Sequence, residues 1–296
     1  MAWLKKMAAA SRQVNYHGTF VYQHGRSPVE TSRITHFFSA GGEYEKLETL
    51  DGPAREIIRN NNNVTCYLPE SKTIVIEKRA PRRFPAMLPE QLSSIADSYV
   101  VKKGERGRVA GYDCQILALE PRDNLRYGHK FCAELATGLP LRARVYNDKN
   151  EMVESFVFTH LTIGAGVSKD MLRSRYAARS QTWRVDKSAL EQKETSEDTG
   201  WTLKNQPAGF KKLTEVKRSV AGRATTTSHI VYSDGLAAIS VFIEPMPESP
   251  PPLGPTYQGA FNIYVRAQAD QMVTVVGETP ARTVKQIAES LSSRDQ

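Results

Sequence analysis

The sequence MVESFVFTHL, residues 152–161, alternates between two sets of side chains with a period of two. Phe156 and Phe158 fall on one side, and Val157 and Leu161 fall on the other. This period is typical of a β-strand whose two faces meet different surroundings, whereas a helix would repeat every three to four residues. The stretch therefore predicts an antiparallel sheet.

Ten more stretches upstream have the length and composition of strands, and they are separated by glycine, proline and asparagine turns. They lie at 16–23, 30–38, 43–50, 54–60, 63–68, 72–78, 99–104, 112–119, 127–135 and 141–147. A twisted sheet of so many strands does not stay flat, so we expect it to curl into a large half-open antiparallel β-barrel. Helices are predicted at 3–14 and 90–98, and no parallel crossover is expected.

Residues 187–200 are polar, charged and free of aromatic side chains, and therefore cannot bury much apolar surface. We interpret them as a linker between a domain at 1–186 and a second domain at 201–296. The chain has 296 residues, about twice the usual domain length, which agrees with this division.

The second domain is predicted to be a smaller antiparallel sheet with a C-terminal helix. Strands are expected at 210–219, 228–233, 236–244, 259–266 and 272–277, with a tight turn at Asp234-Gly235 and a proline-rich loop at 246–257. Thr279 is expected to cap the helix, with Pro280 as its first residue. Val284, Ile287, Ala288 and Leu291 form its apolar stripe.

Three cysteines are too few for a disulfide scaffold and too isolated for a zinc site. A hairpin turning near Asp123 would place Cys114 almost opposite Cys132, so a disulfide between them is one reading and free buried thiols are the other.

The residue pattern gives little support for catalysis. The six histidines do not have metal-ligand spacing, and no serine lies in a Gly-x-Ser-x-Gly turn. We therefore predict a protein that is not an enzyme, without catalytic residues, metal or cofactor. Residues 1–10 lack the apolar core of a signal peptide, and no stretch is long enough to span a membrane.

The formal net charge is +8, of which residues 1–200 carry +6. This excess suits an anionic partner such as an acidic peptide, a phosphorylated lipid or nucleic acid, although a merely solvated basic surface is the commoner explanation of such a charge. Basic and apolar residues adjoin in a proline-rich break, and we predict a lipid site there. Its residues are Arg79, Arg82 and Arg83 for the headgroup, and Phe84, Met87, Leu88, Phe20 and Tyr22 for the chains. Ordinary core packing is the alternative for the aromatic residues.

Several motifs are similar to those of the MucB/RseB family, over nearly the whole chain. They are residues 51–56 (DGPARE), 111–114 (GYDC) and 138–142 (GLPLR), followed by Trp201, Pro207, Gly209 and Phe210, and by residues 231–236 (VYSDGL). The resemblance implies a lipoprotein-carrier-like half-barrel followed by a partner-binding domain. It also implies a periplasmic regulator of envelope-stress and alginate signalling, whose chain here would be a mature form with Met1 added.

By this resemblance, the protein would bind the periplasmic part of a membrane-spanning anti-sigma factor, shield it from the site-one and intramembrane proteases, and release it on binding lipid or lipopolysaccharide. We predict that the partner surface lies mainly on the second domain, at Phe210, Lys211, Lys212, Lys217, Arg218 and Tyr232. An edge strand guarded by lysines against aggregation is the alternative. A lipid or lipoprotein carrier is the leading alternative function. Nucleic-acid binding is not expected, because no recognition helix, zinc finger or RNA-binding strand motif is present. The sequence leaves a homo-oligomer open.

Overall fold

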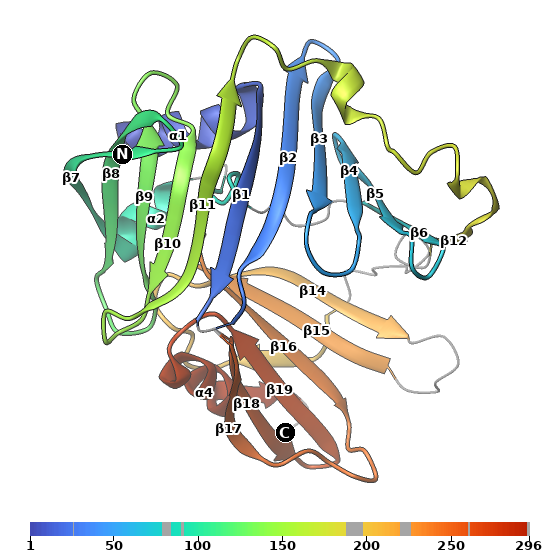
Figure 1. Cartoon of the computed structure of the whole chain (residues 1–296). Coiled ribbons are helices and arrows are strands. Elements are labelled where there is room, and N and C mark those ends of the chain that lie inside the picture. Colours follow the sequence, from blue (N-terminus) through green and yellow to red (C-terminus); the bar gives the residue numbers. More distant parts are fainter. Residues whose placement is uncertain are drawn as a thin grey trace.

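A computed structural model of the chain describes residues 1–25, 27–78, 84–89, 92–187, 198–219, 226–259 and 261–294. Two antiparallel sheets dominate it, a large curved one above and a smaller one below (Figure 1). We call the part up to residue 187 the N-terminal unit and the part from residue 198 the C-terminal unit.

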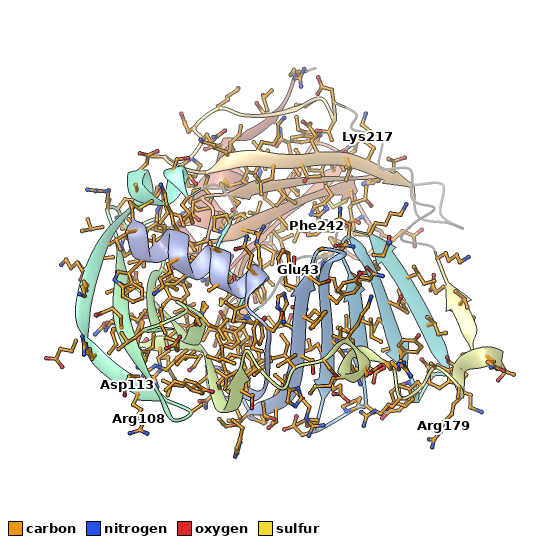
Figure 2. The ribbon with its side chains drawn as sticks, turned by 90° about the horizontal axis from the view of Figure 1, so that it is seen from above. Glu43, Arg108, Asp113, Arg179, Lys217 and Phe242 are labelled. Carbon is orange, nitrogen blue, oxygen red and sulfur yellow. A yellow bond between two sulfur atoms is a disulfide. The ribbon has the colours of Figure 1, made fainter. Side chains whose placement is uncertain are left out.

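The N-terminal unit contains a twelve-stranded sheet with the order β12-β6-β5-β4-β3-β2-β1-β11-β10-β9-β8-β7. Its elements are α1 (Ala2–Gln13), β1 (Tyr16–His24), β2 (Glu30–Ser39), β3 (Gly42–Thr49), β4 (Glu56–Asn60), β5 (Asn63–Leu68), β6 (Thr73–Lys78), α2 (Ser93–Ser98), β7 (Tyr99–Val109), β8 (Tyr112–Pro121), β9 (Gly128–Glu134), β10 (Pro140–Tyr146), β11 (Met152–Ile163), the 3₁₀ turns η1 (Lys169–Leu172) and η2 (Ser180–Thr182), and β12 (Arg184–Asp186). The sheet is curled and open, as the strand count predicted, and α1 lies along its inner side (Figure 2).

The C-terminal unit contains a six-stranded sheet with the order β14-β15-β16-β19-β18-β17 and a short pair, β13 with β20. Its elements are β13 (Trp201–Leu203), β14 (Lys211–Ser219), β15 (Thr226–Ser233), β16 (Ala238–Pro245), β17 (Gly254–Gln258), β18 (Phe261–Gln268), β19 (Gln271–Gly277), α4 (Ala281–Ser290) and β20 (Leu291–Ser293). Of the predicted apolar stripe, Val284, Ile287 and Ala288 lie on α4, whereas Leu291 lies in β20 directly after it. All four are at most 2% exposed and belong to the core of this unit.

Each unit has its own hydrophobic core. In the N-terminal unit, Leu4 and Met7 of α1 pack with Phe131 and Leu141 of the sheet. In the C-terminal unit, the core lies between the sheet and α4. The boundary at 187–200 stays a prediction, since residues 188–197 lie outside the described part of the chain.

Cys114 and Cys132 form a disulfide, with their Cα atoms 5.4 Å apart. The hairpin of β8 and β9 pairs Cys132 with Ile116, two residues beyond Cys114, so the two cysteines meet diagonally. The first of the two readings of these residues is therefore confirmed. Cys66 is a half-buried free thiol.

Three local predictions in the strands are wrong. Strand β7 does not end at residue 104 but continues to Val109. A bulge between Lys103 and Arg106 shifts the register within the glycine-rich stretch, and pairing with β8 resumes after it. The loop expected at 246–257 contains β17, an edge strand, where proline is tolerated because one side of the backbone needs no donor. One pair in the large sheet is parallel, namely β12 with β6.

The predicted helix caps also need correction. Helix α4 begins at Ala281 and not at Pro280, whose ψ of 145° is extended. Pro280 is itself the cap, and its carbonyl accepts the N–H of Thr283 at 2.8 Å. Helix α2 begins at Ser93, and residues 90 and 91 of the predicted helix lie outside the described residues.

Candidate functional site

Four aromatic side chains line the inner face of the curved sheet where β1 pairs with β11. The register places Phe20 opposite Phe158 and Tyr22 opposite Phe156, so alternation brings all four rings to one face. We call these four residues the aromatic floor. Phe84, from the stretch before α2, packs onto it with centroid distances of 5.4 Å to Phe20, 5.4 Å to Phe156 and 5.1 Å to Phe158. Phe84 is only 3% exposed, so it fills this part of the concave face.

The apolar residues predicted to hold lipid chains therefore come together from distant parts of the chain. Leu88 is buried in the same core, and Met87 is half-buried against it. Burial raises the pKa of the Tyr22 hydroxyl, and the neighbouring Glu154 raises it further, so this phenol stays neutral. Arg79, Arg82 and Arg83 lie outside the described residues. Lipid binding at this site stays a prediction.

A second cluster lies at the junction of the two units and is centred on Arg126, from the turn between β8 and β9. Its Nη1 donates to Oδ2 of Asp234 at 2.9 Å, and both side chains are fully buried. On its own unit, the guanidinium donates to both carboxylate oxygens of Asp123 at 3.0 Å. It also donates to the carbonyl of Ala208 and lies 5.0 Å from the ring centroid of Phe210. Arg126 thus contacts the C-terminal unit through an ion pair, a carbonyl and an aromatic ring.

The electrostatics of this cluster favour a charged Arg126. Burial opposes its charge, but the hydrogen bonds to Asp123 and the charge of Asp234 outweigh burial, and the pKa of Arg126 is raised. Tyr99 donates from its hydroxyl to Oδ2 of Asp234 at 2.8 Å. Burial, then the charge of Asp234, raises the pKa of Tyr99 and keeps it a donor. The ring centroids of Tyr99 and His129 lie 5.8 Å apart. Burial lowers the pKa of His129 to about 4.

The turn between β15 and β16 carries Asp234 into the N-terminal unit. Oδ1 of Asp234 accepts the backbone N–H groups of Leu236 and Ala237, which holds the carboxylate in place. Gly235 has a φ of +102°, and a Cβ there would lie 3.0 Å from Ser94 Oγ and 3.4 Å from Pro89 Cγ. The predicted tight turn at Asp234-Gly235 is confirmed, and glycine is needed both for its backbone and for this close approach.

Smaller polar contacts surround this cluster. Thr283 Oγ1 donates to the carbonyl of Leu125 at 2.8 Å, and Asn262 Nδ2 donates to the Tyr127 hydroxyl at 3.1 Å. An exposed ion pair joins Arg282 to Asp148 at 3.3 Å. The turn between β8 and β9 and the loop after β10 thus supply most of the polar contacts that the described N-terminal residues make with α4 and β18.

The structure separates the residues predicted to bind the protein partner. Lys211 and Lys212 are exposed on β14, where Lys212 pairs with Glu215, and Lys217 is half-buried. Figure 2 places Lys217 across the molecule from Arg108 of the N-terminal unit. The backbone of Arg218 pairs with Thr227, and its side chain lies outside the described part.

Phe210 and Tyr232 need correction as surface residues. They are 1% and 3% exposed and belong to the core of the C-terminal unit, so in this arrangement their rings do not form the expected aromatic edge. Alternation explains Tyr232, which shares a face with buried Ile230. Phe210 precedes β14 and packs under Arg126.

Sequence reasoning missed Arg126 altogether and saw Asp234 only as a turn residue. A lone arginine in a turn gives no signal of its own, because its role depends on how the two units meet. Within the described residues, no three histidine, cysteine, aspartate or glutamate side chains come together as metal ligands. No described helix is long and apolar enough to cross a membrane.

Comparison with known proteins gives matches along almost the whole chain. The model of the MucB/RseB N-terminal domain matches residues 1–176, and that of the MucB/RseB C-terminal domain matches residues 195–292. The chain is 34% identical to the sigma factor AlgU regulatory protein MucB of Pseudomonas aeruginosa, over 98% of this chain and 89% of that protein.

Two crystal structures of MucB are also similar, each at 28% identity and 99% coverage of this chain. The crystal structure of MucB in complex with MucA(peri) gives a TM-score of 0.78 with 98% of its chain covered, and a further crystal structure of MucB gives 0.67 with 97% covered.

Proposed function

This chain belongs to the MucB/RseB family, and we propose that it is a periplasmic regulator that binds the periplasmic segment of a membrane-spanning anti-sigma factor and shields it from proteolysis. The observation that carries the proposal is the full-length similarity to MucB in complex with MucA(peri), which extends over both units. A relative matched over one unit alone would support a shared fold only. The relatives are named as regulatory proteins, which agrees with a binding role rather than catalysis.

We place the anti-sigma segment on the C-terminal unit, along the cations of β14. Lys211 and Lys212 are exposed at the edge of the six-stranded sheet, and this edge has backbone groups that an extended peptide could pair with. The cations, together with Lys217 and Arg218, would attract a segment rich in carboxylates. Since Phe210 and Tyr232 are buried, they would support this strand from beneath rather than contact the peptide.

We place the lipid on the aromatic floor, where acyl chains would take the position of the Phe84 side chain. The floor supplies apolar area, and each buried CH₂ of a chain contributes roughly 0.8 kcal/mol. We assign the headgroup to Arg79, Arg82 and Arg83, which lie within the five residues before Phe84 in the sequence. Lipid would release the peptide only if the two ligands prefer different arrangements of the protein.

A synthetic peptide covering the periplasmic segment of the anti-sigma factor tests this function by equilibrium binding to the full chain. We expect saturable binding that micelles of a lysophospholipid or added lipopolysaccharide weaken. Replacing Lys211 and Lys212 by glutamate should lower peptide affinity about tenfold or more, because two attractive charges become repulsive. The matched control is Lys103→Glu with Lys149→Glu, which makes the same change in net charge at exposed sites on the N-terminal unit.

Absence of peptide binding to the wild-type chain would contradict the regulator. Lipid binding without peptide binding would favour the second candidate, a periplasmic lipid or lipoprotein carrier, for which the aromatic floor is the supporting observation. Triple replacement of Arg79, Arg82 and Arg83 by glutamate should weaken binding of anionic lipid in either case. Unchanged lipid affinity would move the headgroup site elsewhere.

A further inference from the structure

The junction between the two units contains a buried ion pair, which is an unusual way to hold two parts of one chain together. Interfaces between domains are generally polar and hydrated, and charges within them are usually open to water. Here Arg126 and Asp234 are both 0% exposed in their side chains and lie 2.9 Å apart, one from each unit.

A buried ion pair at such a seam favours two arrangements and disfavours those between them. When the units are together, the lost hydration of both charges is offset by their contact and by the hydrogen bonds from Tyr99 and to Asp123 and Ala208. When the units are fully apart, water hydrates both charges. A small separation would leave them unpaired and still partly buried, which is costly. The seam is therefore a two-state element of the kind that switches require.

The same seam is connected to the aromatic floor. The turn that carries Asp234 packs against Pro89 and Ser94, as the short distances from a Cβ on Gly235 show. Pro89 lies in the same described stretch as Phe84, five residues further along the chain, and Phe84 rests on the floor. An acyl chain that displaces Phe84 would therefore also move the stretch against which the Asp234 turn packs.

We propose that Arg126, Asp234 and Tyr99 form a latch that holds the two units in the arrangement that binds the anti-sigma segment, and that displacement of Phe84 by lipid opens it. The latch rests on the proposed function. It is the element through which the anti-sigma segment and the lipid would oppose each other's binding. The closed arrangement is assigned to the peptide-bound state because this chain gives a TM-score of 0.78 with MucB in complex with MucA(peri), against 0.67 with the other crystal structure of MucB. The three residues are positioning residues. They are buried at the seam beside the start of β14, where Lys211 pairs with Ser233, the neighbour of Asp234, and they supply none of the exposed cations proposed to contact the peptide.

The test uses two variants of the full chain. Asp234→Asn removes the charge of the latch but can keep the hydrogen bonds from Leu236 and Ala237. Tyr99→Phe removes only the hydroxyl that donates to Asp234, so it serves as the milder variant if the first fails to fold. The matched control is Arg282→Ala, which breaks an ion pair between the same units whose side chains are about half exposed, at 52% and 43%.

Three quantities are measured for each protein: affinity for the synthetic anti-sigma peptide, affinity for lysophospholipid micelles, and the radius of gyration from small-angle X-ray scattering. For Asp234→Asn we expect at least tenfold weaker peptide binding, several-fold tighter micelle binding and a larger radius. Tyr99→Phe should change all three in the same directions by less, and Arg282→Ala should match the wild type. A merely structural role would weaken both ligands together.

The possible outcomes separate the latch from the proposed function. If the wild type fails to bind the peptide, the proposed function fails, and the latch is judged on radius and micelle affinity alone. If the variants that fold match the wild type in radius and micelle affinity, the latch is refuted. Weaker peptide binding with an unchanged radius would also refute it, since Asp234 would then act without any change in arrangement.

Discussion

Replacing Phe84 by alanine would remove the side chain that fills the concave face of the N-terminal unit. Phe84 is 3% exposed and has three ring neighbours on the floor within 5.4 Å. A buried Phe→Ala change costs about 3–5 kcal/mol. Phe84 lies in an irregular stretch outside the strands, which can relax into part of the cavity, so we expect the lower end of that range, about 3 kcal/mol.

Urea unfolding followed by tryptophan fluorescence measures this cost, because Trp3 packs against the core of the same unit. Phe38→Ala is the matched control: Phe38 lies on β2 of the same sheet but is 41% exposed, so its loss should cost less than about 1 kcal/mol. Equal costs for the two variants would refute the view that Phe84 is a packed plug.

The same variant has an opposite effect on lipid binding if Phe84 and acyl chains compete for the floor. Removing a plug whose docking is worth about 3 kcal/mol would raise the fraction of protein with an open floor, and apparent affinity rises with that fraction. We expect at least tenfold tighter binding of lysophospholipid micelles by Phe84→Ala. Weaker binding would mean that the Phe84 ring contacts the chain instead of competing with it.

Three other predictions concern stability and organisation. Replacing both Cys114 and Cys132 by serine should lower the free energy of unfolding by about 3 kcal/mol, because the disulfide no longer restricts the unfolded chain across its 18-residue separation. A loss below about 1 kcal/mol in urea titrations would contradict this. Burial, opposed by the charge of Asp234, lowers the pKa of His129 to about 4. Between these two pKa values, His129 is protonated in the unfolded chain but neutral in the folded chain. The free energy of unfolding should therefore fall as the pH drops from 6.5 towards 4, and His129→Phe should flatten this dependence. Limited proteolysis should cut first within 187–200, and a first cut within 210–290 would contradict the domain boundary.

The strands of the N-terminal sheet were predictable because one face of each is buried and the period of two is then visible in the sequence. Residues 152–161 show this best, since Phe156 and Phe158 lie on the inner face that the alternation assigns to them. Phe84 and Leu88 were predicted as part of a lipid site for a different reason: they are apolar residues that adjoin basic ones in a proline-rich break between predicted strands.

Features set by contacts between distant parts were not predictable. A strand at 254–258 was missed because its proline is compatible with an edge, and the sequence does not say which strand lies at the edge. The burial of Tyr232 depends on which face of the six-stranded sheet faces the core. The sequence of a single strand of eight residues does not determine that. Arg126 and Asp234 are 108 residues apart in sequence, and only the packing of the two units brings them together.

The central claim is that this protein shields an anti-sigma factor segment, and the rate of proteolysis of that segment measures this directly. The periplasmic segment is incubated with its site-one protease, with and without saturating amounts of the full chain. We expect cleavage to slow at least tenfold in the presence of the protein and lipopolysaccharide to restore the rate. A rate that is the same with and without the protein would contradict it.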